Sequence, residues 1–131
     1  MKGVVMSDVR FLRCARCGNV FAVLVDGGVT PLCCGEPMVP LVAGTSDGAR
    51  EKHVPAVTRA GDELRVRVGS VDHPMLAAHY IQFIAVAYGA RLEVARLAPG
   101  DEPAATFAVP EGQAAMVYEL CNLHGLWSAP A

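Results

Sequence analysis

The sequence has little with which to bind nucleic acid. Its 131 residues include 11 lysines and arginines against 13 aspartates and glutamates, which gives a formal net charge of −2. Without a basic excess, the phosphates of a nucleic acid would not be neutralised. Aromatic residues make up only 6% of the chain, too few to predict a surface on which bases stack. We therefore expect no nucleic-acid partner.

The sequence also lacks a convincing membrane or targeting segment. Residues 73–90 contain no charged residue and are just long enough to span a bilayer. However, the first half of this stretch holds two histidines, a glutamine and a proline, and polar groups are costly in lipid. Near the N-terminus, Asp8 and Arg10 interrupt any apolar run, so no signal peptide is predicted. We expect a cytoplasmic protein with no membrane contact.

Charged residues are few, at 18%, whereas hydrophobic residues reach 53%, so a packed core is easily filled. Two domains are expected. Residues 1–42 carry four of the five cysteines and are too few to hold a fold without a metal or a disulfide. Residues 43–131 form the second domain, which begins with a small, polar linker over residues 43–50.

The second domain is predicted to be an antiparallel β-sandwich. Residues 63–68 alternate apolar and charged side chains, which is typical of a half-buried strand. Gly61 and Asp62 predict a hairpin turn before it, and residues 26–28 (Asp-Gly-Gly) are a second hairpin signal. The stretch 76–97 is rich in alanine and leucine and resembles a helix. Strands are expected over residues 20–25, 54–60, 63–69, 91–97, 104–109 and 115–120.

The early cysteines form a first candidate metal site. Cys14 and Cys17 have CxxC spacing, and Cys33 and Cys34 follow after fifteen intervening residues. A CxxC turn places two thiolates on one side of a tight loop, and two more can complete a tetrahedral site for zinc or iron. The spacing does not separate these two metals. A disulfide framework is the alternative, but an odd number of cysteines without a signal peptide disfavours it.

A second candidate site combines all four histidines with the remaining cysteine. Its members are His53, His73, His79, Cys121 and His124. Structural zinc needs only four ligands, whereas iron accepts five and keeps a sixth position open. A thiolate opposite that position makes the iron electron-rich. The alternative is a core thiol with unrelated polar histidines, which would leave the CxxH spacing of Cys121 and His124 a coincidence.

Two charged residues directly precede the first histidine. Glu51 and Lys52 are candidates for a gate and an anion guide beside an open metal position, or else they form a solvated charged turn. The sequence does not separate these interpretations.

These stretches together resemble the desulfoferrodoxin family, the two-centre superoxide reductases. The resemblance is carried by CARCGNVFAVL, CCGEPM, EKHVP, VGSVDHPM, HYIQFI and CNLHGLW, which span nearly the whole chain in the family's order. The chain departs from the family pattern at Gln82 and Phe83, where an acidic residue and a tryptophan are expected. It also has Arg13 in place of the aromatic residue before the first cysteine, with Phe11 two residues earlier.

The resemblance implies an all-β protein with a small desulforedoxin-like, rubredoxin-type domain and an immunoglobulin-like β-sandwich of the neelaredoxin type. It implies a first iron on Cys14, Cys17, Cys33 and Cys34. It implies a second, catalytic iron with His53, His73, His79 and His124 as equatorial ligands and Cys121 as axial ligand. Glu51 resembles the carboxylate that fills the sixth position in the oxidised resting state, and Lys52 the lysine that attracts superoxide.

The implied activity is one-electron reduction of superoxide to hydrogen peroxide without release of dioxygen. A rubredoxin-like electron donor and a homodimer are the implied partners. The competing hypothesis is a non-enzymatic iron or zinc module for electron transfer or structure. That hypothesis explains the four early cysteines but leaves Cys121 and the histidines unexplained.

Overall fold

The computed structural model describes residues 9–44 and 50–131, with only the backbone of Glu51. Apart from one helical turn, these residues form β-structure, as the sequence predicts. In chain order the elements are β1 (Arg10–Arg13), β2 (Val20–Val23), β3 (Leu32–Cys33), β4 (Glu36–Pro37), β5 (Val39–Pro40), α1 (Arg50–His53), β6 (Pro55–Ala60), β7 (Glu63–Val68), β8 (Ile81–Tyr88), β9 (Arg91–Arg96), β10 (Ala104–Ala108), β11 (Met116–Cys121) and β12 (Gly125–Pro130).

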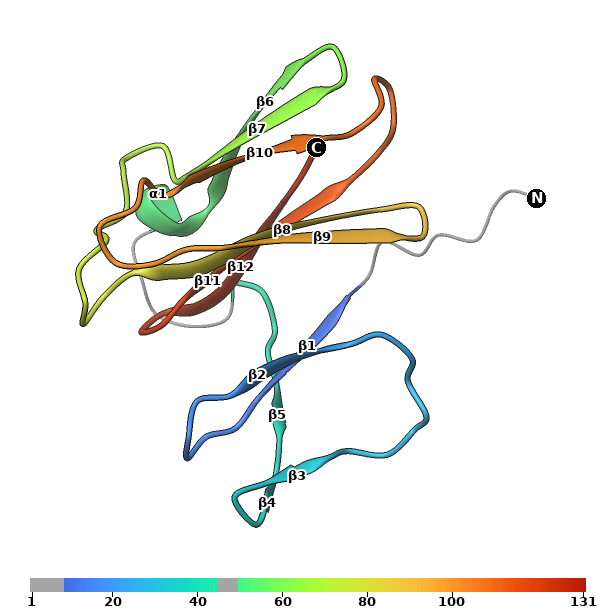
Figure 1. The fold of residues 1–131 in the computed structure, drawn as a ribbon, viewed down its shortest axis with the longest axis vertical. Coiled ribbons are helices and arrows are strands. Elements are labelled where there is room, and N and C mark those ends of the chain that lie inside the picture. The colour runs from blue at the N-terminus through green and yellow to red at the C-terminus, as the bar shows by residue number, and fades with distance from the viewer. Residues whose placement is uncertain (1–8, 45–49) are drawn as a thin grey trace.

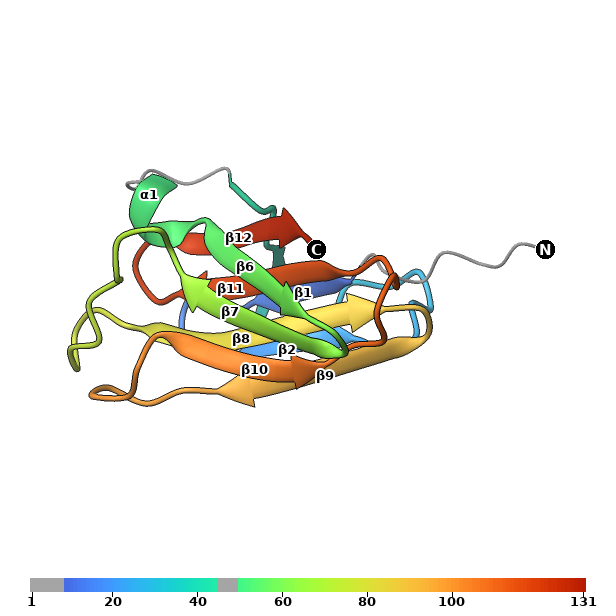
Figure 2. The same ribbon diagram turned by 90° about the horizontal axis from the view of Figure 1, so that it is seen from above.

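Two antiparallel sheets make a β-sandwich (Figures 1 and 2). One sheet has the strand order β10-β7-β6 and the other β12-β11-β8-β9. The predicted hairpin at Gly61 is confirmed, because β6 pairs with β7 from Pro55 opposite Val68 to Ala60 opposite Glu63. The apolar side chains of β7 point into the sandwich and its arginines point outward, as the alternation predicts.

Strand β8 is buried on both of its faces. Ile84 and Val86 belong to the core between the two sheets, whereas Ala85 and Ala87 pack into a second cluster on the outer face of their sheet. Burial on both faces explains the continuous apolar run, because neither side of the strand needs polar residues. Within the described ranges, no helix is long and apolar enough to cross a membrane.

The cysteine-bearing segment lies against the outer face of the four-stranded sheet, with strand order β2-β1-β5 beside a separate β3-β4 hairpin (Figure 1). Phe11 of β1 is the main contact. Its ring centroid lies 5.3 Å from that of Phe83 and 5.4 Å from that of Tyr118. Phe11 of β1 and Phe83 of β8 therefore pack on one another.

One local expectation from the sequence is wrong. Residues 26–28 do not join two paired strands, because β2 pairs backward with β1 while β3 pairs with β4. The turn itself forms, since the Asp26 carboxylate accepts the Gly28 N–H at 2.8 Å and pairs with Arg10. At the end of the expected linker, Arg50 begins the helical turn α1; residues 45–49 lie outside the described ranges.

Candidate metal centres

The four early cysteines converge as the sequence predicts. Cys14 and Cys17 lie on the turn between β1 and β2, and Cys33 and Cys34 lie at the β3-β4 hairpin. Their four sulfur atoms are all within 4.8 Å of one another. All four are free thiols, and Cys17 Sγ lies 3.6 Å from Cys33 Sγ, far beyond a disulfide bond of about 2.05 Å. The spacing is close to the edge of about 3.8 Å in a tetrahedron with metal–sulfur bonds of about 2.3 Å.

The backbone around these sulfurs supports negative charge. The Cys17 N–H donates to Cys14 Sγ at 3.4 Å, and backbone donors of this turn hold the pKa of Cys14 down at about 6. By contrast, contacts with Cys17 and Cys14 raise the pKa of Cys34 to about 12. Several thiolates this close are stable together only around a cation. Gly18 and Gly35 have φ values of +81° and +79°, which let the chain turn after each cysteine pair.

The four histidines and Cys121 also converge, although they come from α1, the 69–80 loop and the β11–β12 turn. Their donor atoms lie within 4.8 Å of one another. The rings of the histidines contact one another around a cycle. Neighbouring centroids are 4.7 Å apart for His53 and His73, 4.6 Å for His73 and His79, 5.1 Å for His79 and His124, and 4.8 Å for His124 and His53. This order places His53 opposite His79, and His73 opposite His124.

Neighbouring nitrogens in this cycle have the spacing of ligands at right angles. His53 Nε2 lies 3.1 Å from His73 Nε2 and 3.2 Å from His124 Nδ1. Two nitrogens at right angles around one ion, with bonds of about 2.1 Å, are about 3.0 Å apart. A single proton on His53 Nε2 cannot form good hydrogen bonds to both neighbouring nitrogens. A cation at the centre, by contrast, attracts the lone pairs of all of these nitrogens.

Two further observations favour a metal here. The buried His79 Nε2 has no hydrogen-bond partner among the described residues, and a coordination bond would satisfy it. His73 Nδ1 lies 2.7 Å from the carbonyl oxygen of Pro74. Since a carbonyl only accepts, Nδ1 carries the proton and the lone pair is on Nε2, the atom aimed at the cluster.

Burial keeps these donors ready for a metal. It lowers the pKa of His73 to about 4 and also lowers the pKa of His79, so both imidazoles are neutral at pH 7. Cys121 is fully buried, which raises its thiol pKa, whereas hydrogen bonds from the Leu123 and His124 amides lower it. A buried thiolate here therefore needs a bound cation as well as these two amides.

Trp127, the only tryptophan, supports two of the histidines. Its ring stacks on His53 with centroids 5.1 Å apart, and its Nε1–H donates to the His124 carbonyl at 3.0 Å. The Arg50 guanidinium lies 6.0 Å from the Trp127 ring centroid, within the range of a cation–π contact. The sequence marked Trp127 only as part of a motif, and its orienting contacts emerge from the structure alone.

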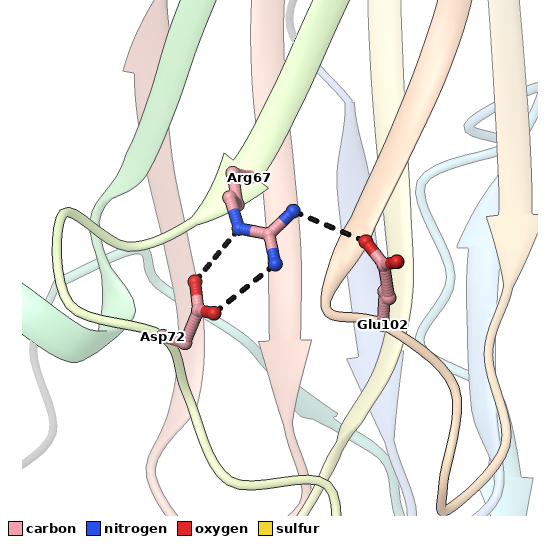
Figure 3. Close-up of polar contacts among 3 residues, drawn as sticks. All are labelled: Arg67, Asp72 and Glu102. Atoms are coloured by element: carbon pink, nitrogen blue, oxygen red, sulfur yellow. Dashed lines mark hydrogen bonds and ion pairs between the residues drawn. The ribbon is translucent and has the colours of Figure 1, made fainter.

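An ion-pair network anchors the loop that carries His73. Arg67 of β7 pairs with both oxygens of Asp72 at 2.7 and 3.0 Å, and with Glu102 at 3.2 Å (Figure 3). Asp72 directly precedes His73 in the chain, and the His73 N–H donates to the Val68 carbonyl at 3.0 Å. This network could not be predicted from the sequence, because Arg67 is simply one of the outward-facing residues of an alternating strand.

Of the two charged candidates before His53, the structure describes the side chain of Lys52 but not that of Glu51. Lys52 is exposed, and its charge contributes to the lowered pKa of His79, so it lies near the histidine cluster. The side chain of Glu51 lies outside the described part of the chain. A further buried acid, Glu119, was missed by the sequence interpretation; it lies in β11 two residues before Cys121 and is fully buried.

Comparisons with known proteins cover both parts of the chain. Residues 45–130 match the family model described as desulfoferrodoxin, and residues 8–41 match the model of the desulfoferrodoxin N-terminal domain. A desulfoferrodoxin of Nitratidesulfovibrio vulgaris is 44% identical over 119 residues, which cover 91% of this chain and 94% of that protein.

Solved structures give a similar picture. The superoxide reductase of Treponema pallidum superimposes with a TM-score of 0.76 and 32% identity, and covers 93% of this chain and 98% of its own. A 1Fe superoxide reductase from Giardia intestinalis has a TM-score of 0.55 and 30% identity. That alignment covers 62% of this chain and 97% of the Giardia chain.

Proposed function

The chain belongs to the desulfoferrodoxin family, and we propose on this basis that it is a superoxide reductase, an oxidoreductase that acts on superoxide as acceptor. The single observation that carries the proposal is the convergence of four imidazoles and one buried thiol within 4.8 Å. That donor set is too large for a structural zinc site and suits an iron that keeps a position for a small molecule.

The five donors take separate roles in this proposal. His53, His73, His79 and His124 would hold an iron ion through their imidazole nitrogens, and Cys121 would be its one sulfur ligand. Iron bound there would supply the electron for the reaction, in which superoxide, one electron and two protons give hydrogen peroxide. The Cys121 thiolate favours this electron donation, and the Leu123 and His124 amides hydrogen-bonded to it moderate its charge. Cys121 belongs to the buried core of the sandwich, which keeps water away from its sulfur.

Lys52 and Glu51 are assigned to the open side of the centre. The chain as a whole is negative, so attraction of an anion such as superoxide must be local. We assign this attraction to Lys52, which is exposed and close enough to influence His79. By family resemblance, we assign to the carboxylate of Glu51 the role of an additional oxygen ligand that oxidised iron would take up.

The four-cysteine site is proposed to hold a second iron, for which zinc is a possible substitute. We propose residues 1–42 as the desulforedoxin-like domain and residues 43–131 as the reductase domain, with the linker over residues 43–50. The electron that restores the ferrous state comes from an external reductant, for which the family implies a rubredoxin-like protein.

We propose that the protein works as a homodimer in the cytoplasm. Several large apolar side chains of the cysteine-bearing segment are exposed, among them Leu24, Val25, Val29 and Leu32. Exposed apolar groups gathered on one segment are typical of a protein interface, and a small domain gains stability from an added interface. Five free thiols fit a reducing compartment. Sedimentation analysis of the purified protein tests the dimer.

The decisive experiment is anaerobic purification followed by metal analysis and superoxide consumption. We expect about two irons per chain, and one hydrogen peroxide formed per superoxide consumed when reductant is present. A dismutase would form only one hydrogen peroxide for every two superoxide ions and would release dioxygen. If the iron-loaded protein does not consume superoxide, the reductase proposal is wrong. The chain is then an electron-transfer or structural metal module.

A further inference from the structure

The 69–80 loop carries two of the five proposed iron ligands but contains no regular strand. Around His79 the loop makes a tight local bridge, in which Leu76 and His79 exchange backbone hydrogen bonds at 2.9 and 3.0 Å. This bridge shapes the loop tip but does not tie it to the other ligands. The contact that does so comes from the β11–β12 turn.

Asn122 forms hydrogen bonds with the chain on both sides of His79. Its side-chain Nδ2–H donates to the Ala78 carbonyl at 3.0 Å, and its Oδ1 accepts the Tyr80 N–H at 2.9 Å. Its own backbone N–H donates to the Tyr80 carbonyl at 3.2 Å. Both side-chain bonds cross to partners more than 40 residues away in sequence, so they join two segments rather than shape one turn.

The position of Asn122 gives these bonds a consequence for the metal centre. It lies directly after Cys121 and two residues before His124, so the amide fixes the distance between the His79 segment and the turn that carries two other ligands. The ligating atom His79 Nε2 has no hydrogen-bond partner within the described residues. The placement of His79 before metal binding therefore depends on how its backbone is held.

We propose that Asn122 is a positioning residue that pre-forms the iron centre by holding His79 in register with Cys121 and His124. This inference rests on the proposed histidine–cysteine iron site. A ligand whose backbone is held in place loses less conformational freedom when the metal binds. Loss of the amide should therefore weaken iron retention and distort the ligand geometry, beyond any general loss of stability.

The test compares Asn122→Ala and Asn122→Asp with two controls. Alanine removes both side-chain bonds, whereas aspartate keeps the acceptor for Tyr80 N–H and sets a carboxylate oxygen against the Ala78 carbonyl. Gln113→Ala removes an exposed amide elsewhere in the sandwich. Tyr88→Phe removes the hydrogen bond from Tyr88 to the Ala108 carbonyl and serves as a control for a purely structural loss.

Three readouts are compared: iron retention against a chelator, the visible spectrum of the ferric protein, and amide hydrogen exchange of Tyr80 in metal-free protein. We expect both Asn122 variants to retain iron about tenfold less well, within the range seen for partners outside the ligand shell. Their sulfur-to-iron absorption band should shift, and the two controls should match the wild type. The Tyr80 amide should exchange faster in the alanine variant and remain protected in the aspartate variant.

The outcomes separate this inference from the proposed function. Wild-type iron retention and spectrum in Asn122→Ala would overturn the positioning role while leaving the reductase intact. Equal losses in Tyr88→Phe would also overturn it, because the effect would then reflect stability alone. A wild-type protein that takes up no iron would overturn the proposed function itself, and Tyr80 exchange would still decide whether Asn122 holds the loop.

Discussion

The Nε2 atoms of His53 and His73 lie 3.1 Å apart, although one residue belongs to α1 and the other to the loop after β7. A proton could join these two nitrogens, but His53 Nε2 also faces His124 Nδ1 at 3.2 Å. Three nitrogens facing one another at these distances fit a shared cation better than a set of hydrogen bonds. The following predictions test what surrounds that cation.

Lys52→Ala should slow the reaction with superoxide and weaken its dependence on salt. The proposed reason is that Lys52 provides local positive charge in a protein whose net charge is −2. We expect a rate constant about tenfold lower at low ionic strength, since steering of this kind changes association rates by about tenfold or more. Pulse radiolysis measures the bimolecular rate directly.

Arg91→Ala is the matched control for Lys52→Ala. It removes the same charge at the β8–β9 turn, at the far end of β8 from His79. Lys52→Arg should keep most of the wild-type rate. An equal decrease in Lys52→Ala and Arg91→Ala would assign the effect to net charge and contradict a local role for Lys52.

Cys121→Ser should abolish reductase activity even where iron remains bound. A serine oxygen cannot replace the thiolate as an electron-rich axial donor. We expect the sulfur-to-iron absorption band to disappear and superoxide consumption to decrease by a factor of about 100 or more, as for loss of one key electrostatic group. Full activity with normal iron content would refute the assignment of Cys121 as axial ligand.

Arg67→Ala should weaken iron retention through the loop that carries His73. The Arg67 contacts with Asp72 and Glu102 are exposed, so each contributes little. We therefore expect a decrease in iron affinity of about fivefold at most, measured by competition with a chelator. Arg65→Ala is the matched control, because Arg65 lies on the same strand face and pairs only locally with Glu63. Equal behaviour of the two variants would exclude an effect of the Asp72 contact on the centre.

Glu119→Gln should remove a pH dependence from the stability of the metal-free protein. Neither carboxyl oxygen of Glu119 has a hydrogen-bond partner in the described part of the chain, and burial raises its pKa to about 9. The folded protein therefore holds a proton at pH 7 that the unfolded chain releases. Because the folded pKa is raised, stability decreases as pH rises from about 4.5 to about 9.

The clearest window for this test lies between about pH 6.5 and 8, above the ordinary histidine pKa and below that of unfolded cysteine. In this window we expect the free energy of unfolding of the wild type to decrease, relative to that of the Gln variant, by about 1.4 kcal/mol per pH unit. Groups common to both proteins, such as Cys14 with its lowered pKa, cancel in this difference. Urea unfolding followed by the fluorescence of Trp127 provides the measurement. Parallel slopes in the two proteins would show that Glu119 is not the titrating group.

Cys33→Ser should remove the metal of the four-cysteine site and leave the metal that the four histidines and Cys121 hold. Cys33 Sγ lies 3.6 Å from Cys17 Sγ, so its loss breaks the four-sulfur set, whereas none of the five donors around His53 is affected. Metal analysis should find about one iron fewer per chain, with superoxide consumption retained. Loss of both metals would show that the two sites depend on each other.

The sequence predicted the β-class and most strands, because alternation and turn residues are local signals. Residues 63–68 and the Gly61 turn identified one hairpin directly. The turn at residues 26–28 led to a wrong prediction of a hairpin, because the residues of a turn do not determine which strands pair. Strand β8 resembled a helix or a membrane segment, because burial on both faces removes the alternation that marks a strand. Its second buried face comes from Phe11, distant in sequence.

The candidate metal ligands were predictable because few residue types bind soft metals. The spacing of these residues along the chain can also be read directly from the sequence. Residue types, together with the CxxC and CxxH spacings, separated a set of four early cysteines from a set of four histidines with Cys121. Only the tertiary structure decided what orients them: the Pro74 carbonyl on His73, the Trp127 ring on His53, and the Asn122 amide on both sides of His79. These contacts join residues from separate strands and loops, and an uncharged asparagine or tryptophan looks the same in sequence whether it holds a ligand or merely packs. The physical reason is that orientation depends on distances set by strand pairing and sheet packing, and the linear order of residues does not contain those distances.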